Sequence, residues 1–227
     1  MKQTTKVILI SILMSALFSC QKTTEVNDLQ EAQLCLNTAA AADAKNCVAK
    51  IASLTSENAY KLRCAAVFIS EGFGSPTSFI SALDQIKNGG TAGYSGSIAA
   101  MGTLNFGSDS TATASANEAF DICSLSGVGV YSQISSIFKL GTNLCVLAGG
   151  ATDPASLATQ ANNLDSATVG AIVQTTYASA CSDLTSASDS TKQYCSELST
   201  AIAAGSTPTA IGACLKFKLA NPNSACP

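Results

Sequence analysis

Cysteine is the residue type with the most informative chemistry here, because the 227 residues include ten cysteines and no histidine. Without histidine the chain has no Ser-His-Asp or Cys-His machinery, no histidine general base and no mixed Cys/His zinc site. Beyond Cys20, no two cysteines are closer than twelve residues: Cys35, Cys47, Cys64, Cys123, Cys145, Cys181, Cys195, Cys214 and Cys226. This spacing excludes Cys-x-x-Cys zinc ribbons, iron–sulfur clusters and thioredoxin-like motifs, and it predicts disulfides.

Two pairs of cysteines are symmetric about predicted turns. Cys35 and Cys47 are each six residues from Ala41, and Cys181 and Cys195 are each seven residues from the middle of the segment between them. Residues equidistant from a turn face each other in an antiparallel helix pair. Helix axes about 8–10 Å apart leave a Cα separation near the roughly 4.4–6.8 Å that a disulfide needs. We therefore predict these two disulfides.

Other pairings stay open at the level of sequence. Cys214 and Cys226 flank the end of the last predicted helix, where a disulfide would hold the C-terminal segment. Two other pairs are also symmetric about predicted turns, Cys195 with Cys214 and Cys47 with Cys64. These pairings compete with the ones above, because each cysteine can form one disulfide. Each short loop that is closed would stabilise the fold by about 3 kcal/mol through the entropy of the unfolded chain.

Three thiols have no clear partner. Cys123 and Cys145 do not face each other across a simple hairpin, and Cys64 is a possible partner for either. Since nine cysteines cannot all pair within the chain, one is expected to stay free or to pair between chains.

The elements that would position these cysteines are helices. Apolar residues recur with helical spacing, capping residues recur before them, and long runs of β-branched and aromatic residues are missing. The predicted helices cover 26–38, 43–54, 56–72, 75–88, 110–127, 128–148, a short segment from 153, 165–181, 189–205 and a last segment from 207. We predict an all-α fold over 28–227, a disulfide-stapled array or bundle of antiparallel helical hairpins in a single compact domain.

One long segment, 89–109, is rich in glycine and is predicted as a loop. In a compact domain, a segment of this length without regular structure is usually either functional or wrongly assigned as a loop. Tyr94, Met101 and Phe106 would then present an adaptable apolar surface to a partner. The alternative is a connector that packs on the core. A short buried helix over 97–104, flanked by turns, is also compatible with the sequence.

The N-terminus has the pattern of an export signal. A short positive region with Lys2 and Lys6 precedes an apolar run, 7–18, which is too short to span a bilayer. The residues 17–20, Leu-Phe-Ser-Cys, resemble the lipobox of bacterial lipoproteins, although Phe18 replaces the usual small residue. This resemblance implies cleavage before Cys20, whose thiol carries a diacylglycerol. The alternative is an ordinary signal peptide, with Cys20 as a disulfide partner.

The predicted organisation is therefore a signal peptide over 1–19, a lipidated tether over 20–27 and the helical domain. Loss of Lys2 and Lys6 changes the net charge from −3 to −5, and basic residues are never clustered, so no nucleic-acid partner is expected. Gln21 follows Cys20, whereas Asp at that position retains lipoproteins of this class in the inner membrane. The resemblance thus implies a lipid anchor in the outer membrane of the cell envelope.

Catalytic motifs are weak. Ser136-x-x-Lys139 fits a Ser-x-x-Lys pattern, but such matches are expected by chance in a serine-rich chain, and no Lys-Thr-Gly element accompanies it. Glu118 and Asp121 are one helical turn apart, as carboxylates on a solvated helix face often are. We expect no enzyme activity, no cofactor and no metal site.

Two functions follow from these observations. The first is a non-catalytic, lipid-anchored helical scaffold or protein-interaction module of the envelope. The second is a carrier of an apolar small molecule or lipid between helices, suggested by the long apolar segment 128–148. The cysteine spacings around 35–64 and 181–214 are also similar enough to suggest an internal duplication, with chance as the equal alternative.

Overall fold

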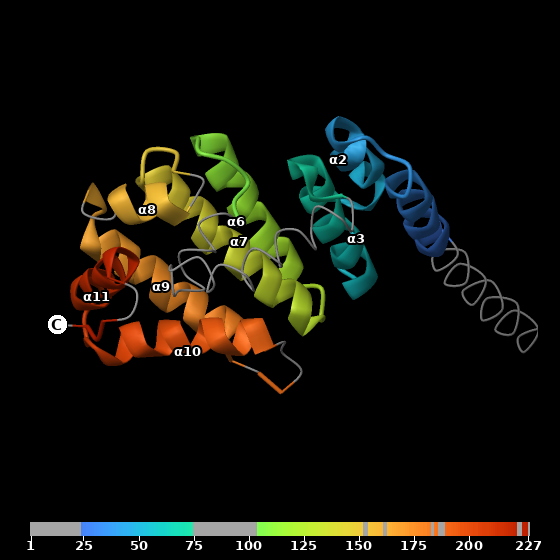
Figure 1. Ribbon diagram of the computed structural model, residues 1–227. Coiled ribbons are helices and arrows are strands. Elements are labelled where there is room, and N and C mark those ends of the chain that lie inside the picture. The colour runs from blue at the N-terminus through green and yellow to red at the C-terminus, as the bar shows by residue number, and fades with distance from the viewer. Residues whose placement is uncertain are drawn as a thin grey trace, which may run out of the picture.

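The computed structural model describes residues 24–74, 104–151, 154–160, 163–182, 184–185, 189–221 and 224–226, and all regular structure in these ranges is helical. The elements are a helix over 24–36, a 3-10 turn Ala41–Asp43, α2 (Ala44–Cys47), a 3-10 turn Ala49–Ile51, α3 (Glu57–Phe68), a π-turn Ile69–Phe73, α6 (Ser110–Ser124), α7 (Gly129–Leu147), α8 (Pro154–Gln160), α9 (Ser166–Ala180), α10 (Asp189–Ala203) and α11 (Pro208–Ala220). The prediction of an all-α, disulfide-stapled compact domain is confirmed (Figure 1).

Local capping explains where several helices begin. Asp109 accepts a hydrogen bond from the backbone N–H of Ala112 at 2.8 Å, which caps α6. Thr207 caps α11 in the same way and is followed by proline at the first helical position. Each cap satisfies a backbone donor that the first helical turn leaves unpaired. The starts of these helices are therefore encoded within a few residues of sequence.

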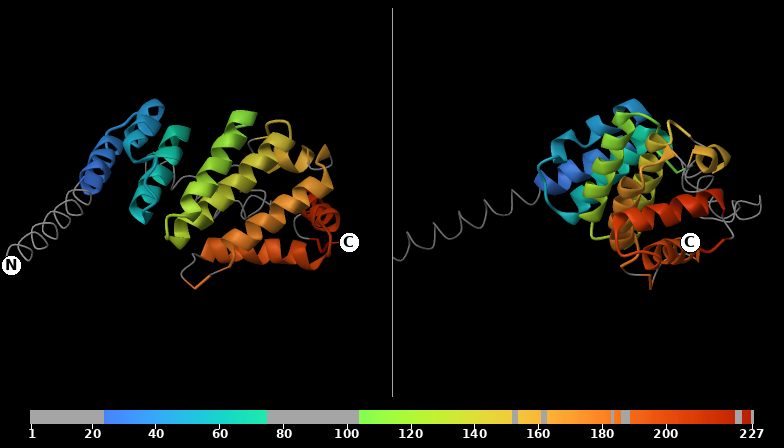
Figure 2. Two further views of the ribbon diagram at one scale, coloured as in Figure 1. Left: turned by 180° about the vertical axis from the view of Figure 1, so that it is seen from behind. Right: turned by 90° about the vertical axis from the view of Figure 1, so that its left-hand side faces the viewer.

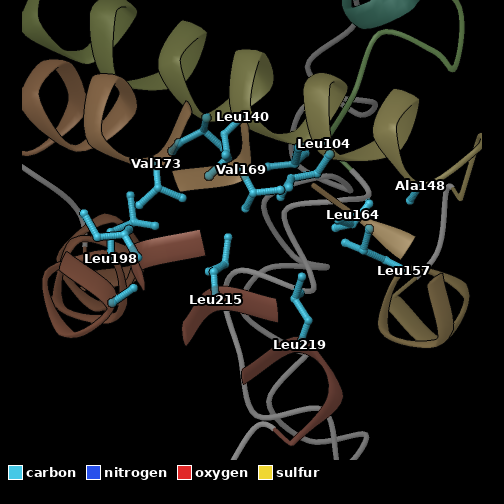
Figure 3. Packing of buried hydrophobic residues seen from close by; sticks show 14 of the residues in the cluster. Leu104, Leu140, Ala148, Leu157, Leu164, Val169, Val173, Leu198, Leu215 and Leu219 are labelled. Atoms are coloured by element: carbon cyan, nitrogen blue, oxygen red, sulfur yellow. The ribbon is translucent and has the colours of Figure 1, made fainter. Parts of the chain in front are cut away.

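The larger of two apolar cores lies among α7, α8, α9, α10 and α11. α7 packs along both α6 and α9, and its buried face includes Phe138, Leu140 and Leu144. Figure 3 shows leucines and valines from all five helices converging there, together with Leu104. Burial of such side chains, at about 25 cal/mol per Å² of apolar area, is the main favourable term in folding this part.

A smaller core lies on the opposite side of α3. The helix 24–36, α2 and the two 3-10 turns bury Leu36, Cys47, Val48 and Ile51 against the Ala59 and Ala66 side of α3. The other side of α3 carries Phe68, which packs on the larger core. In Figures 1 and 2, α3 accordingly lies between the N-terminal helices and α6. α3 is the element that joins the two cores.

Helices α9 and α11 approach each other closely through two glycines. A Cβ on Gly170 would overlap the carbonyl oxygen of Pro208, and a Cβ on Gly212 would overlap that of Ser166. Because residue 170 meets 208 while 166 meets 212, the two helices run antiparallel. Lys216 of α11 extends the contact by donating a hydrogen bond to the carbonyl oxygen of Leu164 at 2.6 Å.

The cap of α9 leads to a prediction about acid stability. Asp165 accepts hydrogen bonds from the hydroxyl and the backbone N–H of Thr168, and these bonds lower the pKa of its carboxyl below the usual value. A depressed pKa stabilises the folded state above about pH 4, and this contribution is lost as the pH falls through the folded pKa. We expect Asp165→Asn, which can still cap, to lose less stability than the wild type in urea unfolding between pH 5 and pH 2. Parallel pH profiles would contradict this expectation.

Four disulfides join helices and turns within the described residues. Cys35 bonds Cys47, and Cys181 bonds Cys195, with Cα separations of 5.5 and 5.6 Å; these are the two pairs that turn symmetry predicts. Cys214 bonds Cys226 at 5.1 Å, so the alternative pairing of Cys195 with Cys214 is wrong. Three of the four disulfides thus close loops of 12 to 14 residues.

The fourth disulfide joins Cys64 of α3 to Cys123 of α6, with a Cα separation of 5.0 Å and 59 residues between them in sequence. Of the possible partners for Cys64, the structure therefore selects Cys123 and excludes Cys47. The third cysteines of the two presumed repeats are bonded differently: Cys64 is bonded to Cys123, and Cys214 is bonded to Cys226. An internal duplication gains no support from this connectivity.

Two segments differ from expectation. The predicted helix 43–54 is divided into short turns, because Val48 has φ −101° and ψ 3° and ends α2 while its side chain stays buried. Helical structure includes residues 24–27, which belong to the predicted tether 20–27. The predicted helix 75–88 lies outside the described residues.

Candidate functional site

A glycine at the end of α3 positions the most notable surface feature of the protein. The π-turn that follows α3 contains Gly72 with φ 86°, a conformation that residues with a Cβ rarely adopt. The chain thereby redirects Phe73, whose ring lies 4.6 Å from that of Phe138 with the planes at 80°. Turns of this kind within helices occur frequently at functional sites.

Four phenylalanines form a cluster beneath this turn. Phe68 packs edge-on against Phe106 and Phe138, with ring centroids 5.4 and 5.1 Å apart, and Phe106 lies 5.0 Å from Phe138. Phe138 is 1% exposed, whereas Phe68 and Phe73 are half-buried. The T-shaped contacts are the favoured geometry of aromatic pairs and give the cluster a defined shape. The two half-buried rings provide a rigid apolar floor at the surface.

An apolar cleft of about 310 Å³ opens over this floor, between α3 and the first turns of α7. Its lining residues are Cys64, Ala65, Phe68, Ile69, Phe73, Gly74, Tyr131 and Ile134. The phenol of Tyr131 is the single polar side chain among these described residues, since Cys64 is in a disulfide. Volume and lining are those of a small apolar binding site. The cleft can hold an apolar group, but its lining offers no acid–base pair for catalysis.

Next to the cleft, the connection between α6 and α7 forms an exposed apolar tip, 125–131. Leu125, Val130 and Tyr131 are 55%, 51% and 39% exposed, which makes them three of the five large exposed apolar residues in the described part of the chain. Tyr131 belongs both to this tip and to the cleft. The apolar tip and the cleft are therefore one continuous surface, and such surfaces usually mark interaction sites.

The structure revises the predicted partner-binding loop. Phe106 lies inside the phenylalanine cluster, and its backbone N–H donates a hydrogen bond to Thr142 of α7 at 3.0 Å. Leu104 beside it is fully buried. This end of the segment is a connector packed on the core, the alternative that the sequence left open. Tyr94 and Met101 lie outside the described residues.

Cys145 is the free cysteine of the described residues, and it is buried on α7. Burial raises the pKa of its thiol, which lowers the fraction of reactive thiolate. In a Cys20→Ser protein, we expect a thiol reagent to find no reactive group in the native state and one after unfolding without reductant. Cys145→Ser should remove that single thiol. Two further thiols in the unfolded protein, three in all, would mean that one of the four disulfides is not formed.

The weak catalytic motifs are not assembled into a site. The hydroxyl of Ser136 is buried and donates to the carbonyl oxygen of Ser132 at 2.7 Å, while the ammonium of Lys139 lies over the ring of Phe120 at 4.1 Å. Glu118 forms an ion pair with Lys45 at 2.6 Å. Within the described ranges, no cluster of three or more His, Cys, Asp or Glu residues could hold a metal ion.

Sequence reasoning missed the residues that form the cleft. Its walls come from α3 and α7, which are about 60 residues apart in sequence, so no local pattern connects them. One signal was present: Phe68 and Phe73 are five residues apart with Gly72 between them, a spacing that fits a π-turn better than an α-helix. The predicted helix 56–72 treats Gly72 as its end, and the structure shows that the helical turn continues to Phe73.

The chain matches no protein-family model, and neither a curated protein nor a solved structure is significantly similar to it. Among the helices of the described residues, none combines the length and the apolar character needed to cross a membrane.

Proposed function

We propose that this protein is a lipid-anchored, non-catalytic component of the bacterial cell envelope that binds a partner protein through its apolar cleft. The observation that carries the proposal is a cleft of about 310 Å³ whose rigid floor and walls are apolar and carry no charge. An apolar side chain of a partner would bury itself there, as anchor residues do in protein interfaces. Four disulfides support a location outside the reducing cytoplasm.

The anchor in this proposal is Cys20, lipidated as the lipobox resemblance implies, with the outer membrane as the location. Cells fed an alkyne-bearing fatty acid should yield labelled wild-type protein in the outer-membrane fraction. Cys20→Ser should abolish the label and release the protein from the membrane. Cys145→Ser is the matched control, since it removes a cysteine without touching the lipobox. Labelling that survives Cys20→Ser would refute the lipid anchor at this residue.

The partner is tested by a photo-crosslinking amino acid placed at Ile134, inside the cleft. A matched probe at Thr209, exposed on α11 at the other end of the molecule, serves as the control. In intact cells we expect a defined crosslinked protein from position 134 and none from position 209. Crosslinks that are the same at both positions, or absent from both, would remove the support for a protein partner at the cleft.

The cleft volume also favours a second candidate, a carrier of an apolar small molecule or lipid, because about 310 Å³ lies within the range of typical ligand pockets, near its lower end. Ala65→Leu would fill part of the cleft, whereas Ala178→Leu places the same side chain on the exposed surface of α9. Native mass spectrometry should show a bound ligand that Ala65→Leu removes and Ala178→Leu retains. A wild-type protein without any bound ligand would argue for the protein-binding function.

A further inference from the structure

The apolar tip, 125–131, is unusual because it is exposed to solvent and lies within a long stretch of sequence without charged residues. No Asp, Glu, Lys or Arg occurs between Asp121 and Lys139. A surface segment that avoids charge and exposes Leu125, Val130 and Tyr131 would lose little hydration on entering an apolar environment. Tyrosine in addition favours the boundary between water and lipid, where its ring is buried and its hydroxyl stays hydrated.

The tip lies beside the start of α3. A Cβ on Gly127 would come within 2.7 Å of the carboxyl group of Glu57, the first residue of α3. The same end of α3 forms a groove with the helix 24–36, and Val26, Asn58 and Lys61 are among the residues that line it. Val26, the start of α3 and the tip therefore line one edge of the molecule, which we call the N-terminal edge. Figures 1 and 2 show the α6–α7 connection on the same side as the beginning of the helix 24–36.

The chain length to Cys20 determines how far this edge can be from a membrane. Three residues lie between Cys20 and Thr24, where the described helix begins, so the two Cα atoms are at most about 14 Å apart. Val26, which is 60% exposed, lies two residues further along. A bilayer that holds lipid on Cys20 is thus within a few residues' length of Val26, at the N-terminal edge.

We propose that the apolar tip inserts into the interface of the bilayer and orients the protein, with Leu125, Val130 and Tyr131 as the inserted side chains. This inference rests on the proposed lipid anchor at Cys20. The charged residues at the edge are compatible with it, because Glu57 and Lys61 are paired at 3.9 Å and can remain at the level of the headgroups. Lipid chains and a second hydrophobic contact together hold a protein on a membrane more firmly than either does alone.

An orientation of this kind has a consequence for the cleft. Tyr131 lines the cleft as well as the tip, so the cleft would open close to the membrane surface. A partner reaching the cleft would then be a protein at the same membrane, or the apolar part of a lipid in it. The cleft, which is the proposed binding site, would then lie on the side of the molecule that faces the membrane.

The absence of tryptophan from the chain makes the inference directly testable. The full lipidated protein carrying Tyr131→Trp would be incorporated into vesicles of phosphatidylethanolamine and phosphatidylglycerol with brominated acyl chains, which quench tryptophan at short range. Phe217→Trp, on α11 at the far end of the molecule, is the matched control. We expect position 131 to lose about half of its emission relative to unbrominated vesicles and position 217 to lose almost none.

Flotation of the vesicles separates the possible failures. Protein that floats while position 131 stays unquenched would overturn insertion and leave the lipid anchor standing, and it would favour a protein partner on the tip. Protein that does not float would overturn the anchor and the insertion together. Leu125→Trp provides a second reporter on the tip, so the inference does not depend on a single substitution that could disturb the cleft.

Discussion

Replacing Gly170 or Gly212 by alanine is expected to destabilise the protein by roughly 3 kcal/mol, although alanine is the better helix former by about 1 kcal/mol. The added Cβ would overlap a backbone carbonyl oxygen of the neighbouring helix, at Pro208 in one case and at Ser166 in the other. Backbone atoms in a helix cannot rotate aside as the end of a flexible side chain can. α9 and α11 would have to move apart, and the core between them would open.

The control for this prediction is Gly129→Ala, at the start of α7. No atom lies within 4 Å of the position that its Cβ would take, so we expect a change of at most about 1 kcal/mol. Urea unfolding followed by far-UV circular dichroism measures all three variants. If Gly170→Ala and Gly212→Ala unfolded at the same urea concentration as Gly129→Ala, the close contact of α9 with α11 would be contradicted.

The features that could be predicted from sequence are local. Asp165 and the Thr207-Pro208 pair mark the starts of α9 and α11 because a cap acts on backbone groups within three residues. The disulfides Cys35–Cys47 and Cys181–Cys195 were accessible for the same reason, since a turn symmetric about two cysteines brings them together.

Features that depend on tertiary contacts could not be predicted from the sequence. Val48 ends α2 inside a segment with good helical spacing, because it is buried in the smaller core with a non-helical backbone. Phe106 looked like part of a binding loop, since its burial depends on rings from α3 and α7. The candidate cleft combines both kinds of information: Gly72 was visible as a break, but its role in directing Phe73 onto Phe138 appears only in three dimensions.

The disulfide between Cys64 and Cys123 is expected to contribute more stability than any other in the described part of the chain. It closes a loop of 59 residues, for which the chain-entropy model gives about 4 kcal/mol, against about 3 kcal/mol for the 12-residue loop of Cys35–Cys47. It is also the disulfide that joins α3, which contacts the smaller core, to α6, which packs on α7.

The double variant Cys64→Ala/Cys123→Ala should therefore lose about 4 kcal/mol and also lose cooperativity between the two cores. An ion pair between Lys45 and Glu118 also links α2 to α6, but both side chains are more than 40% exposed. Exposed pairs of this kind contribute at most about 1 kcal/mol, so this one cannot replace the disulfide.

The measurement is hydrogen exchange combined with urea unfolding, with Cys35→Ala/Cys47→Ala as the matched control. Without Cys64–Cys123, amides of the helix 24–36 and of α3 should exchange faster than those of α7 and α9, because the smaller core can open while the larger one stays folded. The control variant removes a disulfide that joins the helix 24–36 to α2, two elements on the same side of α3, so it should lower stability without removing the link between the cores. Uniform protection in both double variants would show that packing of α3 against α6 and α7 joins the cores, with the disulfide adding stability alone.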